Sequence, residues 1–433
     1  MRVSMSILVA AFFSAAILAA CGGNNGLPSS TAISPQSLRH MSVRERVLHS
    51  FTGYPGDGNF PYASLTDVNG TLYGTTQYGG AYYGGTVFQI TTSGAESVLH
   101  SFGMNEDKGG TDGYAPVAGL INVGGTLYGT TISGGGGSQS SPCSFEGDGG
   151  CGTVFAITGS GVESVIYPFA GGTDGEHPTA GLVNVNGTLY GTTSYGGGYG
   201  CGGYGCGTVF AITPSGGESV IYRFAGSTDG ANPNAALTAV NGTLYSTTIS
   251  GGAYNGGTVF AITPSGGETV LHSFGGGSGD GRLPYAGLTA VNGTLYGTTY
   301  NGGHSACRGR GCGTVFAIMP SGVESVIYRF AGYTDGANPV ASLIYVNGML
   351  YGTTENGGGR HSACGRIGCG TVFQTTPSGG ESVLYSFKRR HGENPLAALT
   401  DVKGKLYGTA YYGGTGCSSD YREGCGTVFS LSL

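Results

Sequence analysis

The stretch NGTLYGTT at residues 69–76, followed by GTVF at residues 85–88, decides the fold of this 433-residue chain. Both segments recur through the chain, and the spacing between copies varies almost wholly in glycine-rich loops. A repeat of 51 to 62 residues has to be interpreted before any single motif, because repeats of this length build solenoids or propellers. The seven copies of LYGTT begin at Leu72, Leu127, Leu189, Leu244 (as LYSTT), Leu295, Leu350 and Leu406 (as LYGTA).

One repeat contains four strand-like runs, at residues 61–68, 71–76, 86–91 and 96–102. Asn69-Gly70, between the first two runs, is a strong signal for a two-residue hairpin because both positions need positive φ. Four antiparallel strands with turn residues at fixed offsets indicate a propeller blade. Gly74, inside the second run, indicates a close approach of the backbone to a neighbouring aromatic ring.

The two ends of the chain divide one repeat between them. Residues 44–51 (RERVLHSF) are a fourth run without the first three, and the chain ends in GTVFSLSL, the close of three runs without a fourth. A linear solenoid gives no reason for this division. We therefore predict an all-β fold, a seven-bladed β-propeller with four antiparallel strands per blade, closed by the N-terminal strand, which completes the last blade.

Composition excludes several classes of protein. Gly and Pro number 90 and 16, but an apolar share of 39% in register with Tyr and Phe allows a buried core. Collagen is excluded because the G-X-Y period is missing. The net charge of −6 gives no argument for a nucleic-acid partner.

The N-terminus predicts export. Residues 1–20 combine Arg2 with an apolar run that ends in small residues, as in a secretory signal peptide. The junction Leu18-Ala19-Ala20-Cys21 resembles the lipobox of bacterial lipoproteins, which implies that Cys21 is the lipidated N-terminus and that the partner is a membrane. An ordinary signal peptide with a chance Cys is the alternative. We expect residues 21–42 to hold this Cys and a flexible tether, residues 43–433 to form the propeller, and the protein to reside in the bacterial cell envelope, facing the periplasm or the cell surface.

Ten further cysteines form five local pairs, and the second member of each pair directly precedes a GTVF segment. An even number in an exported chain favours disulfides over metal-binding or catalytic thiols. A zinc site would need two pairs to converge, which separate repeats make improbable. The pairs are Cys143/Cys151, Cys201/Cys206, Cys307/Cys312, Cys364/Cys369 and Cys417/Cys425.

The repeat resembles the GloVer (Gloeo_Verruco) family of bacterial exported tandem-repeat proteins. The resemblance rests on NGTLYGTT, the glycine doublets and GTVFxI, and it covers residues 43–433. It implies location and architecture but no established activity.

The loops between strands two and three and the linkers between blades emerge on one face of a propeller. This loop face carries all five cysteine loops, and its charge varies most between repeats. Residues 1–300 carry 7 basic and 16 acidic side chains, whereas residues 301–433 carry 11 and 8. We define a basic arc that would bind an acidic glycan, a phosphate-bearing polymer or an acidic envelope protein. The alternative is that its charges only aid solubility. The arc comprises His304, Arg308, Arg310, His361, Arg366, Lys388, Arg389, Arg390 and His391.

Other candidate sites have simpler explanations. The recurring Asp-Gly pairs of the linkers are turn signals, since one carboxylate per linker does not make a calcium site. His49, His100 and His272 occupy a strand position that Tyr takes in other blades, so we interpret them as half-buried strand residues. Asp67 and Asp401 occupy equivalent positions in adjacent blades, but Asn, Ala or Tyr stands there elsewhere. We predict no catalytic residue, no metal and no cofactor, although the loop histidines His177, His304, His361 and His391 leave a metal centre as a minority hypothesis.

These observations predict a non-catalytic binding or scaffolding propeller that binds a glycan or a protein on its loop face. The alternative is a polysaccharide-active lyase or hydrolase on the same face, and a third possibility is a component of outer-membrane assembly. The fold does not choose among them.

Overall fold

The computed structural model describes residues 43–103, 111–136, 143, 150–359, 364, 367–417 and 424–433. Residues Ser42–Leu433 form one compact unit. The predicted signal peptide, Cys21 and the tether lie outside the described residues. No helix in the described part of the chain is long and apolar enough to span a membrane.

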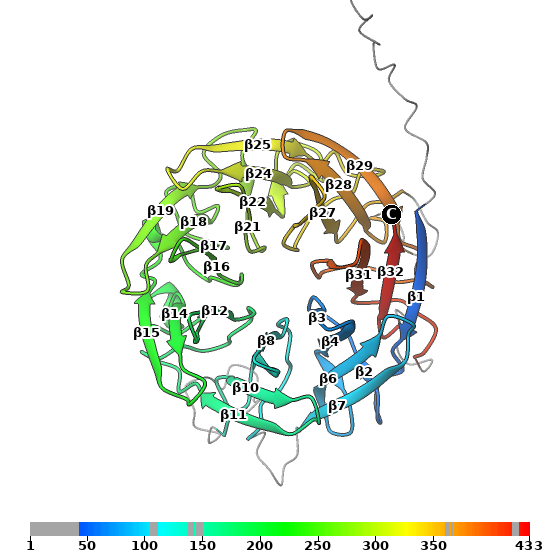
Figure 1. Ribbon diagram of the computed structural model, residues 1–433. Helices are drawn as coiled ribbons and strands as arrows, with labels where there is room; N and C mark the ends of the chain where they lie inside the picture. Colours follow the sequence, from blue (N-terminus) through cyan, green and yellow to red (C-terminus); the bar gives the residue numbers. More distant parts are fainter. Residues whose placement is uncertain are drawn as a thin grey trace, which may run out of the picture. The chain divides into compact units, whose positions relative to one another are not determined.

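The predicted seven-bladed, all-β propeller is confirmed. Seven antiparallel sheets are arranged in a ring (Figure 1). Each sheet has four main strands, which follow one another from the centre of the ring to its rim. The innermost strands are β3(Thr66–Val68), β8(Ile121–Val123), β12(Val183–Val185), β16(Thr238–Val240), β21(Thr289–Val291), β26(Ile344–Val346) and β30(Thr400–Val402). The second strands are β4(Thr71–Thr76), β9(Thr126–Thr131), β13(Thr188–Thr193), β17(Thr243–Thr248), β22(Thr294–Thr299), β27(Met349–Thr354) and β31(Lys405–Ala410).

The third strands are β6(Tyr83–Thr91), β10(Thr153–Thr158), β14(Thr208–Ile212), β18(Thr258–Ile262), β24(Thr314–Ile318), β28(Thr371–Thr376) and β32(Thr427–Ser432). The outermost strands are β7(Glu96–Gly103), β11(Glu163–Pro168), β15(Glu218–Arg223), β19(Glu268–Ser273), β25(Glu324–Arg329), β29(Gly379–Ser386) and β1(Arg44–Ser50). Short pairs, β2(Gly58–Asn59) with β5(Tyr78–Gly79) and β20(Gly281–Arg282) with β23(Asn301–Gly302), join a linker to a loop. Helical structure in the described residues is limited to two 3-10 turns, η1(Cys201–Gly203) and η2(Ser227–Asp229).

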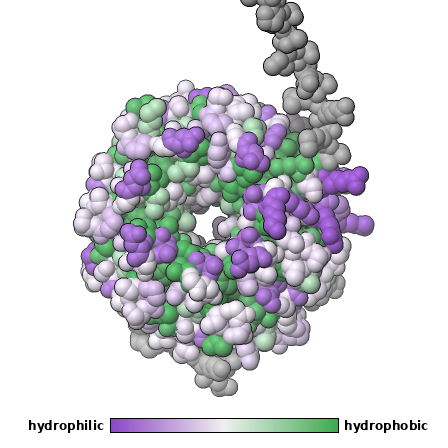
Figure 2. Space-filling view, in the orientation of Figure 1, coloured by the Kyte–Doolittle hydropathy of each residue, from purple (hydrophilic) through white to green (hydrophobic). Residues whose placement is uncertain are grey.

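One sheet contains both ends of the described chain, in the order β1-β32-β31-β30. β1 is antiparallel to β32, with Arg44 opposite Ser432 and Ser50 opposite Thr427. Hydrogen bonds join this seventh blade to the first, because Thr409 Oγ1 donates to the Ala63 carbonyl (3.1 Å) as Thr75 Oγ1 does to the Ala118 carbonyl at the next interface. Hydrophilic side chains gather over this sheet in the view of Figure 2.

Aromatic rings fill the space between blades. The Phe that ends each outermost strand packs edge-to-face against the Phe of the third strand in the next blade, as Phe102 does on Phe155 with ring centroids 5.1 Å apart. In six blades the third-strand ring lies directly over the glycine of the second strand, and in the fourth blade Ser246 stands opposite Phe260. A Cβ added to Gly129 would lie 2.6 Å from Phe155 Cζ, which confirms the predicted close approach at this position of the repeat.

We expect Gly129→Ala to lower the free energy of unfolding by about 1–3 kcal/mol, because its methyl group would overlap the Phe155 ring and Leu120. Gly159→Ala is the matched control, since its Cβ would meet nothing within 4 Å and its φ is not left-handed. Chemical denaturation followed by circular dichroism measures both. Equal stability of the two variants would show that the ring does not constrain this glycine.

Candidate functional site

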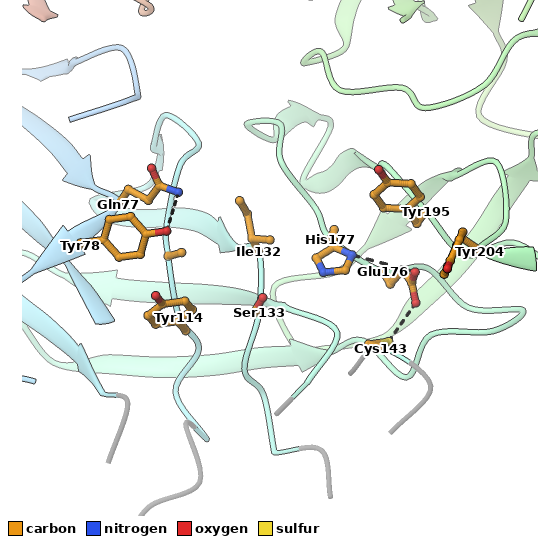
Figure 3. A pocket seen from close by; sticks show the side chains of 11 residues that line it. Gln77, Tyr78, Tyr114, Ile132, Ser133, Cys143, Glu176, His177, Tyr195 and Tyr204 are labelled. Carbon is orange, nitrogen blue, oxygen red and sulfur yellow. Dashed lines mark hydrogen bonds and ion pairs between the residues drawn. The ribbon is translucent and has the colours of Figure 1, made fainter. Parts of the chain in front are cut away.

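A pocket of about 450 Å³ opens on the predicted loop face, over the first three blades (Figure 3). The loops between strands two and three of these blades and the linkers that enter blades two and three supply its walls. Four of its side chains are tyrosines, and no Lys or Arg of the described residues lines it. The lining residues are Gln77, Tyr78, Tyr114, Ala115, Ile132, Ser133, Cys143, Glu176, His177, Tyr195 and Tyr204.

Backbone hydrogen bonds fix the linkers to the loops around this pocket. Tyr114 N donates to the Ser133 carbonyl (2.8 Å) and Ser133 N donates to the Tyr114 carbonyl (3.2 Å). Glu176 and Tyr195 exchange the same pair of bonds, both at 3.1 Å. At these two points the linkers and the loops are therefore paired like neighbouring strands of an antiparallel sheet.

His177 enters the pocket from a left-handed backbone conformation, with φ of 55°. The equivalent linker residue is left-handed in every blade, and Asn fills that position in three of them, as the conformation favours. His177 is held there by its N–H, which donates to the Cys151 carbonyl (2.9 Å), and by its carbonyl, which accepts from Ser194 N (3.1 Å). The left-handed conformation is therefore a feature of the repeat, which also holds Phe60 and Leu283 in this way.

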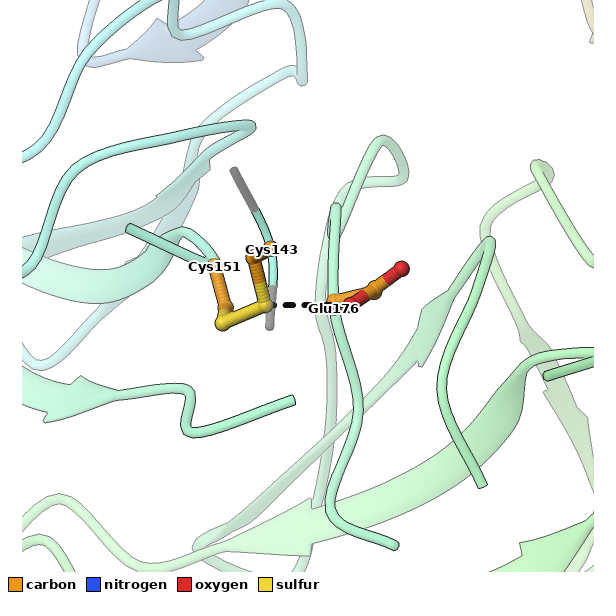
Figure 4. Close-up of side chains that lie close together, drawn as sticks. All are labelled: Cys143, Cys151 and Glu176. Carbon is orange, nitrogen blue, oxygen red and sulfur yellow. Dashed lines mark hydrogen bonds between the residues drawn. A yellow bond between two sulfur atoms is a disulfide. The ribbon is translucent and has the colours of Figure 1, made fainter. Parts of the chain in front are cut away.

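Glu176 is a buried carboxyl group at the base of the pocket. Its Oε2 lies 3.0 Å from Sγ of Cys143, which forms a disulfide with Cys151 (Figure 4). A disulfide sulfur has no proton to donate, so this contact is favourable only when the carboxyl group is protonated. Burial raises the pKa of Glu176 to about 7, and His177 Nδ1 lies 4.0 Å from Glu176 Oε1. The pocket thus holds a carboxyl group that titrates near neutral pH.

A second hollow, of about 220 Å³, lies at the mouth of the central opening and shares Gln77 and Ile132 with the pocket. The variable residue of the P-x-A segment lines it in six blades, and two of these residues are Tyr62 and Tyr285. Burial, followed by the negative charge of Glu355, raises the pKa of both tyrosines, so they remain neutral hydroxyl groups.

Tyrosine is the most common exposed large apolar residue in the described part of the chain. Of the large apolar side chains that the structure describes as exposed, ten are Tyr and four are Val, Met or Ile. Nine of these ten tyrosines lie in or at the edge of loops, linkers or P-x-A segments of the loop face. The ten are Tyr54, Tyr62, Tyr82, Tyr83, Tyr195, Tyr199, Tyr204, Tyr254, Tyr333 and Tyr345.

The structure places the described members of the basic arc at two separate positions. Arg308 and Arg310 are exposed in the loop of blade five, and His304 is exposed beside them. In the linker to blade seven, Arg389 Nε pairs with Glu393 Oε2 (2.9 Å), and His391 Nδ1 pairs with Glu45 Oε2 (2.9 Å). Lys388 and Arg390 are exposed there, whereas His361 and Arg366 of the intervening blade lie outside the described residues. The arc remains a prediction.

The five predicted disulfides are all formed, with Cα–Cα distances of 5.2 to 5.5 Å. They join Cys143 to Cys151, Cys201 to Cys206, Cys307 to Cys312, Cys364 to Cys369 and Cys417 to Cys425.

The second member of each pair is buried beneath the loop face. Cys206, Cys312 and Cys425 are at most 1% exposed and belong to apolar core clusters. None of these three lines the pocket. They precede the buried third strands directly, so the ring encloses them with those strands. We therefore count Cys206, Cys312 and Cys425 as residues of the core and not as residues of a binding site.

Four groups of side chains among the described residues have metal-ligating atoms close together. Two of them combine a disulfide with Glu176 or Glu393, and their sulfurs are bonded to each other instead of free to ligate. The other two groups are His49, Asp57 and Glu96, and His272, Asp280 and Glu324.

Sequence reasoning found the face of the site but not its position on that face. It followed basic charge to blades five to seven, whereas the pocket lies over blades one to three. A signal was available two residues before the Pro of each linker. Glu176 and Glu393 stand at this position in two linkers, whereas four other linkers have an uncharged residue there. Asp67 and Asp401 each accept a hydrogen bond within their own hairpin, from Gly70 N (2.8 Å) and Gly404 N (3.0 Å), as Asn122 does from Gly125 N.

Comparisons with known proteins identify the repeat. A family profile described as Gloeobacter/Verrucomicrobia repeat matches residues 37–142 and 136–367. No curated protein matches the chain. Similar solved structures include the computationally designed Ika8 protein (12% identity, 90% of this chain and 100% of that one, TM-score 0.46) and the PQQ-bound aldose sugar dehydrogenase from Streptomyces coelicolor (12% identity, 90% and 98%, TM-score 0.45). A putative gluconolactonase is similar at 12% identity (90% and 92%, TM-score 0.41).

Proposed function

This chain belongs to the Gloeobacter/Verrucomicrobia repeat family, and we propose that it is an exported, non-catalytic propeller that binds a neutral glycan on its loop face. The observation that carries this proposal is the pocket lined by Tyr78, Tyr114, Tyr195 and Tyr204 on a face rich in exposed tyrosines. Exposed apolar surface of this kind marks binding sites. Tyrosine combines an apolar ring, which stacks on the C–H face of a sugar, with a hydroxyl group that binds its polar edge.

The polar lining supports a neutral sugar ligand. Gln77, Ser133 and His177 offer donors and acceptors to hydroxyl groups, and the pocket volume falls within the range of about 300–1,000 Å³ of small-ligand sites. An acidic sugar would bring its charge beside the Glu176 carboxyl without a Lys or Arg of the described lining to pair with it. Acidic ligands suit the basic arc instead.

The N-terminal features and the disulfides support a place in the cell envelope. Five disulfides are typical of proteins in oxidising compartments outside the cytosol. We extend the proposal to Cys21 as a lipidated anchor, with residues 22–42 as a tether that holds the binding face away from the membrane.

Binding is tested with neutral and acidic polysaccharides by affinity electrophoresis, with calorimetry for those that are retained. We expect Tyr195→Ala and Tyr204→Ala each to weaken neutral-glycan binding about tenfold, which is about 1.4 kcal/mol. Tyr254→Ala is the control, because Tyr254 is 57% exposed on the same face and does not line the pocket. Unchanged binding in both pocket variants would refute the proposed site.

The same panel tests the basic arc. If the wild type retains acidic polymers, a variant of the basic arc shows whether they bind there. Loss of retention in this variant would place the binding site on the basic arc instead of in the pocket. The variant changes to Ser the residues Arg308, Arg310, Arg366, Arg389 and Arg390.

A polysaccharide-active enzyme is the second candidate, and Glu176 favours it. A carboxyl group with a pKa of about 7 inside a pocket is suited to general acid catalysis. Release of reducing ends by the wild type, and its loss in Glu176→Gln, would establish an enzyme. Binding without release supports the proposed non-catalytic role.

A further inference from the structure

Six of the seven interfaces between blades repeat one three-residue arrangement. It joins the His or Tyr two residues before the terminal Phe of an outermost strand, the Asp of the Asp-Gly linker, and the first Glu of the next outermost strand. At one Tyr interface, Tyr222 Oη donates to Asp229 Oδ2 (3.0 Å) and lies 3.4 Å from Glu268 Oε2. The repeat therefore brings two carboxylates and one further polar group together at six interfaces, whereas His391 takes the place of the Asp beside Tyr385 and Glu45 at the seventh.

Two of the His interfaces bring three potential metal ligands close together. His49 Nε2 lies 3.1 Å from Asp57 Oδ2 and 3.9 Å from Glu96 Oε2. His272 Nε2 lies 3.5 Å from Asp280 Oδ1, and Glu324 completes the group. In each group the three ligand atoms lie within 4.8 Å of one another. Zinc is bound at about 2.0–2.2 Å by N and O ligands, so two ligands of a tetrahedral ion are about 3.3 Å apart, close to these separations.

Each of the two groups includes a glutamate oxygen that a cation would satisfy. Oε1 of Glu96 and Oε1 of Glu324 are buried without a hydrogen-bond partner among the described residues, as is the equivalent Oε1 at the other interfaces, so the His that replaces Tyr is what distinguishes the two groups. A buried polar atom without a partner costs about 1–3 kcal/mol, and native proteins contain few of them. A divalent cation would bind these atoms and compensate the two negative charges of each group.

The aspartates are already oriented for ligation. Thr52 N donates to Asp57 Oδ2 (2.8 Å) and Gly58 N donates to Asp57 Oδ1 (2.7 Å). Gly281 N donates to Asp280 Oδ1 in the same way (2.7 Å). Hydrogen bonds from the surrounding backbone to a ligating carboxylate are a general feature of metal sites.

We propose that His49–Asp57–Glu96 and His272–Asp280–Glu324 are two sites for a divalent transition metal of the zinc class, each of which links adjacent blades. The first connects β1 of the seventh blade to β7 of the first, and the second connects β19 to β25. Imidazole with carboxylates suits zinc and its neighbours, and a three-residue site leaves a fourth position for water. None of these residues lines the pocket, so the inference does not depend on glycan binding.

The remaining interfaces supply natural controls. Tyr replaces His at four interfaces, at Tyr167, Tyr222, Tyr328 and Tyr385, so His→Tyr is a substitution that the repeat itself uses. The third His interface, His100 with Asp112, lacks three ligand atoms within 4.8 Å in the described part of the chain, and the Asp112 side chain is 28% exposed. We expect no metal there.

The test is calorimetric titration of zinc chloride into the mature, oxidised protein after treatment with a chelator. We expect two equivalents of Zn²⁺, a rise in melting temperature on binding, one equivalent for His49→Tyr or His272→Tyr, and none for the double variant. His100→Tyr should keep both equivalents. If a His→Tyr variant does not fold, Glu96→Gln and Glu324→Gln remove a ligand charge with little change of shape. A wild-type stoichiometry other than two, or two equivalents in the double variant, would overturn the proposal.

Discussion

Phe88→Ala is expected to lower the free energy of unfolding by about 3–5 kcal/mol. Phe88 and Phe51 are both fully buried, and their ring centroids lie 5.2 Å apart at the interface where β1 of the seventh blade meets the first blade. Truncation removes this contact and leaves a cavity over Gly74 and Leu65, which the ring now covers. Few single substitutions in this chain should cost more.

The matched variant is Phe316→Ala, because Phe316 covers Gly297 and makes the same contact with Phe274 at 5.0 Å between two blades that are consecutive in the sequence. If the closing interface is packed like the others, the two variants should lower the free energy of unfolding by amounts that agree within about 0.5 kcal/mol. Tyr254→Ala, on the surface, should change stability by less than that. Urea denaturation followed by circular dichroism measures all three, and a loss below about 1 kcal/mol for Phe88→Ala would contradict the packing described here.

The architecture was predictable because its structural requirements recur at fixed offsets in the sequence. The terminal Phe is present in all seven repeats, the strand glycine in six and the Asn-Gly pair in five, so agreement between the copies distinguishes the repeat from chance matches. The glycine is favoured because the ring of the third strand occupies the place of its Cβ, as at Gly129 under Phe155. One copy of the repeat would not have shown this.

The site was less predictable because it depends on what differs between blades. Glu176 and Tyr195 meet through a linker and a loop that are 19 residues apart and bonded as an isolated bridge. The sequence shows a charged residue before His-Pro but not its burial against a disulfide. The inter-blade groups were missed for another reason: the Asp of each Asp-Gly pair does form a turn, as predicted, and its contacts with the neighbouring blade depend on a register that only the folded ring defines.

The stability of the propeller should fall as the pH rises from 5 to 8. Burial, followed by the charge of a neighbouring Asp, raises the pKa of Glu218 and Glu268 to about 7, and burial also raises the pKa of Glu381 to about 7. The ordinary value of 4.5 applies when the chain is unfolded. Between these two values the folded protein binds more protons than the unfolded chain, so the free energy of unfolding decreases with rising pH.

Each of these three sites should contribute about 1 kcal/mol to the decrease, after allowance for partial solvent screening. The geometry of these interfaces also explains why the glutamate side chain favours its protonated form. Tyr328 Oη donates to Asp335 Oδ2 (2.9 Å) while it also faces Glu381, and one hydroxyl proton does not satisfy two ionised carboxylates. A proton on the glutamate supplies the second donor.

Melting temperatures at pH 5 and pH 8 test this pH dependence in the wild type and in the triple variant Glu218→Gln, Glu268→Gln, Glu381→Gln. Glutamine resembles the protonated glutamate, so the triple variant should be more stable than the wild type at pH 8 and should lose most of the difference between the two pH values. Asp401→Asn is the control, because Asp401 is an exposed residue of β30 whose equivalent in other blades is already Asn. A wild type that melts at a higher temperature at pH 8 than at pH 5 would show that these glutamates are ionised in the folded ring and that other donors satisfy them.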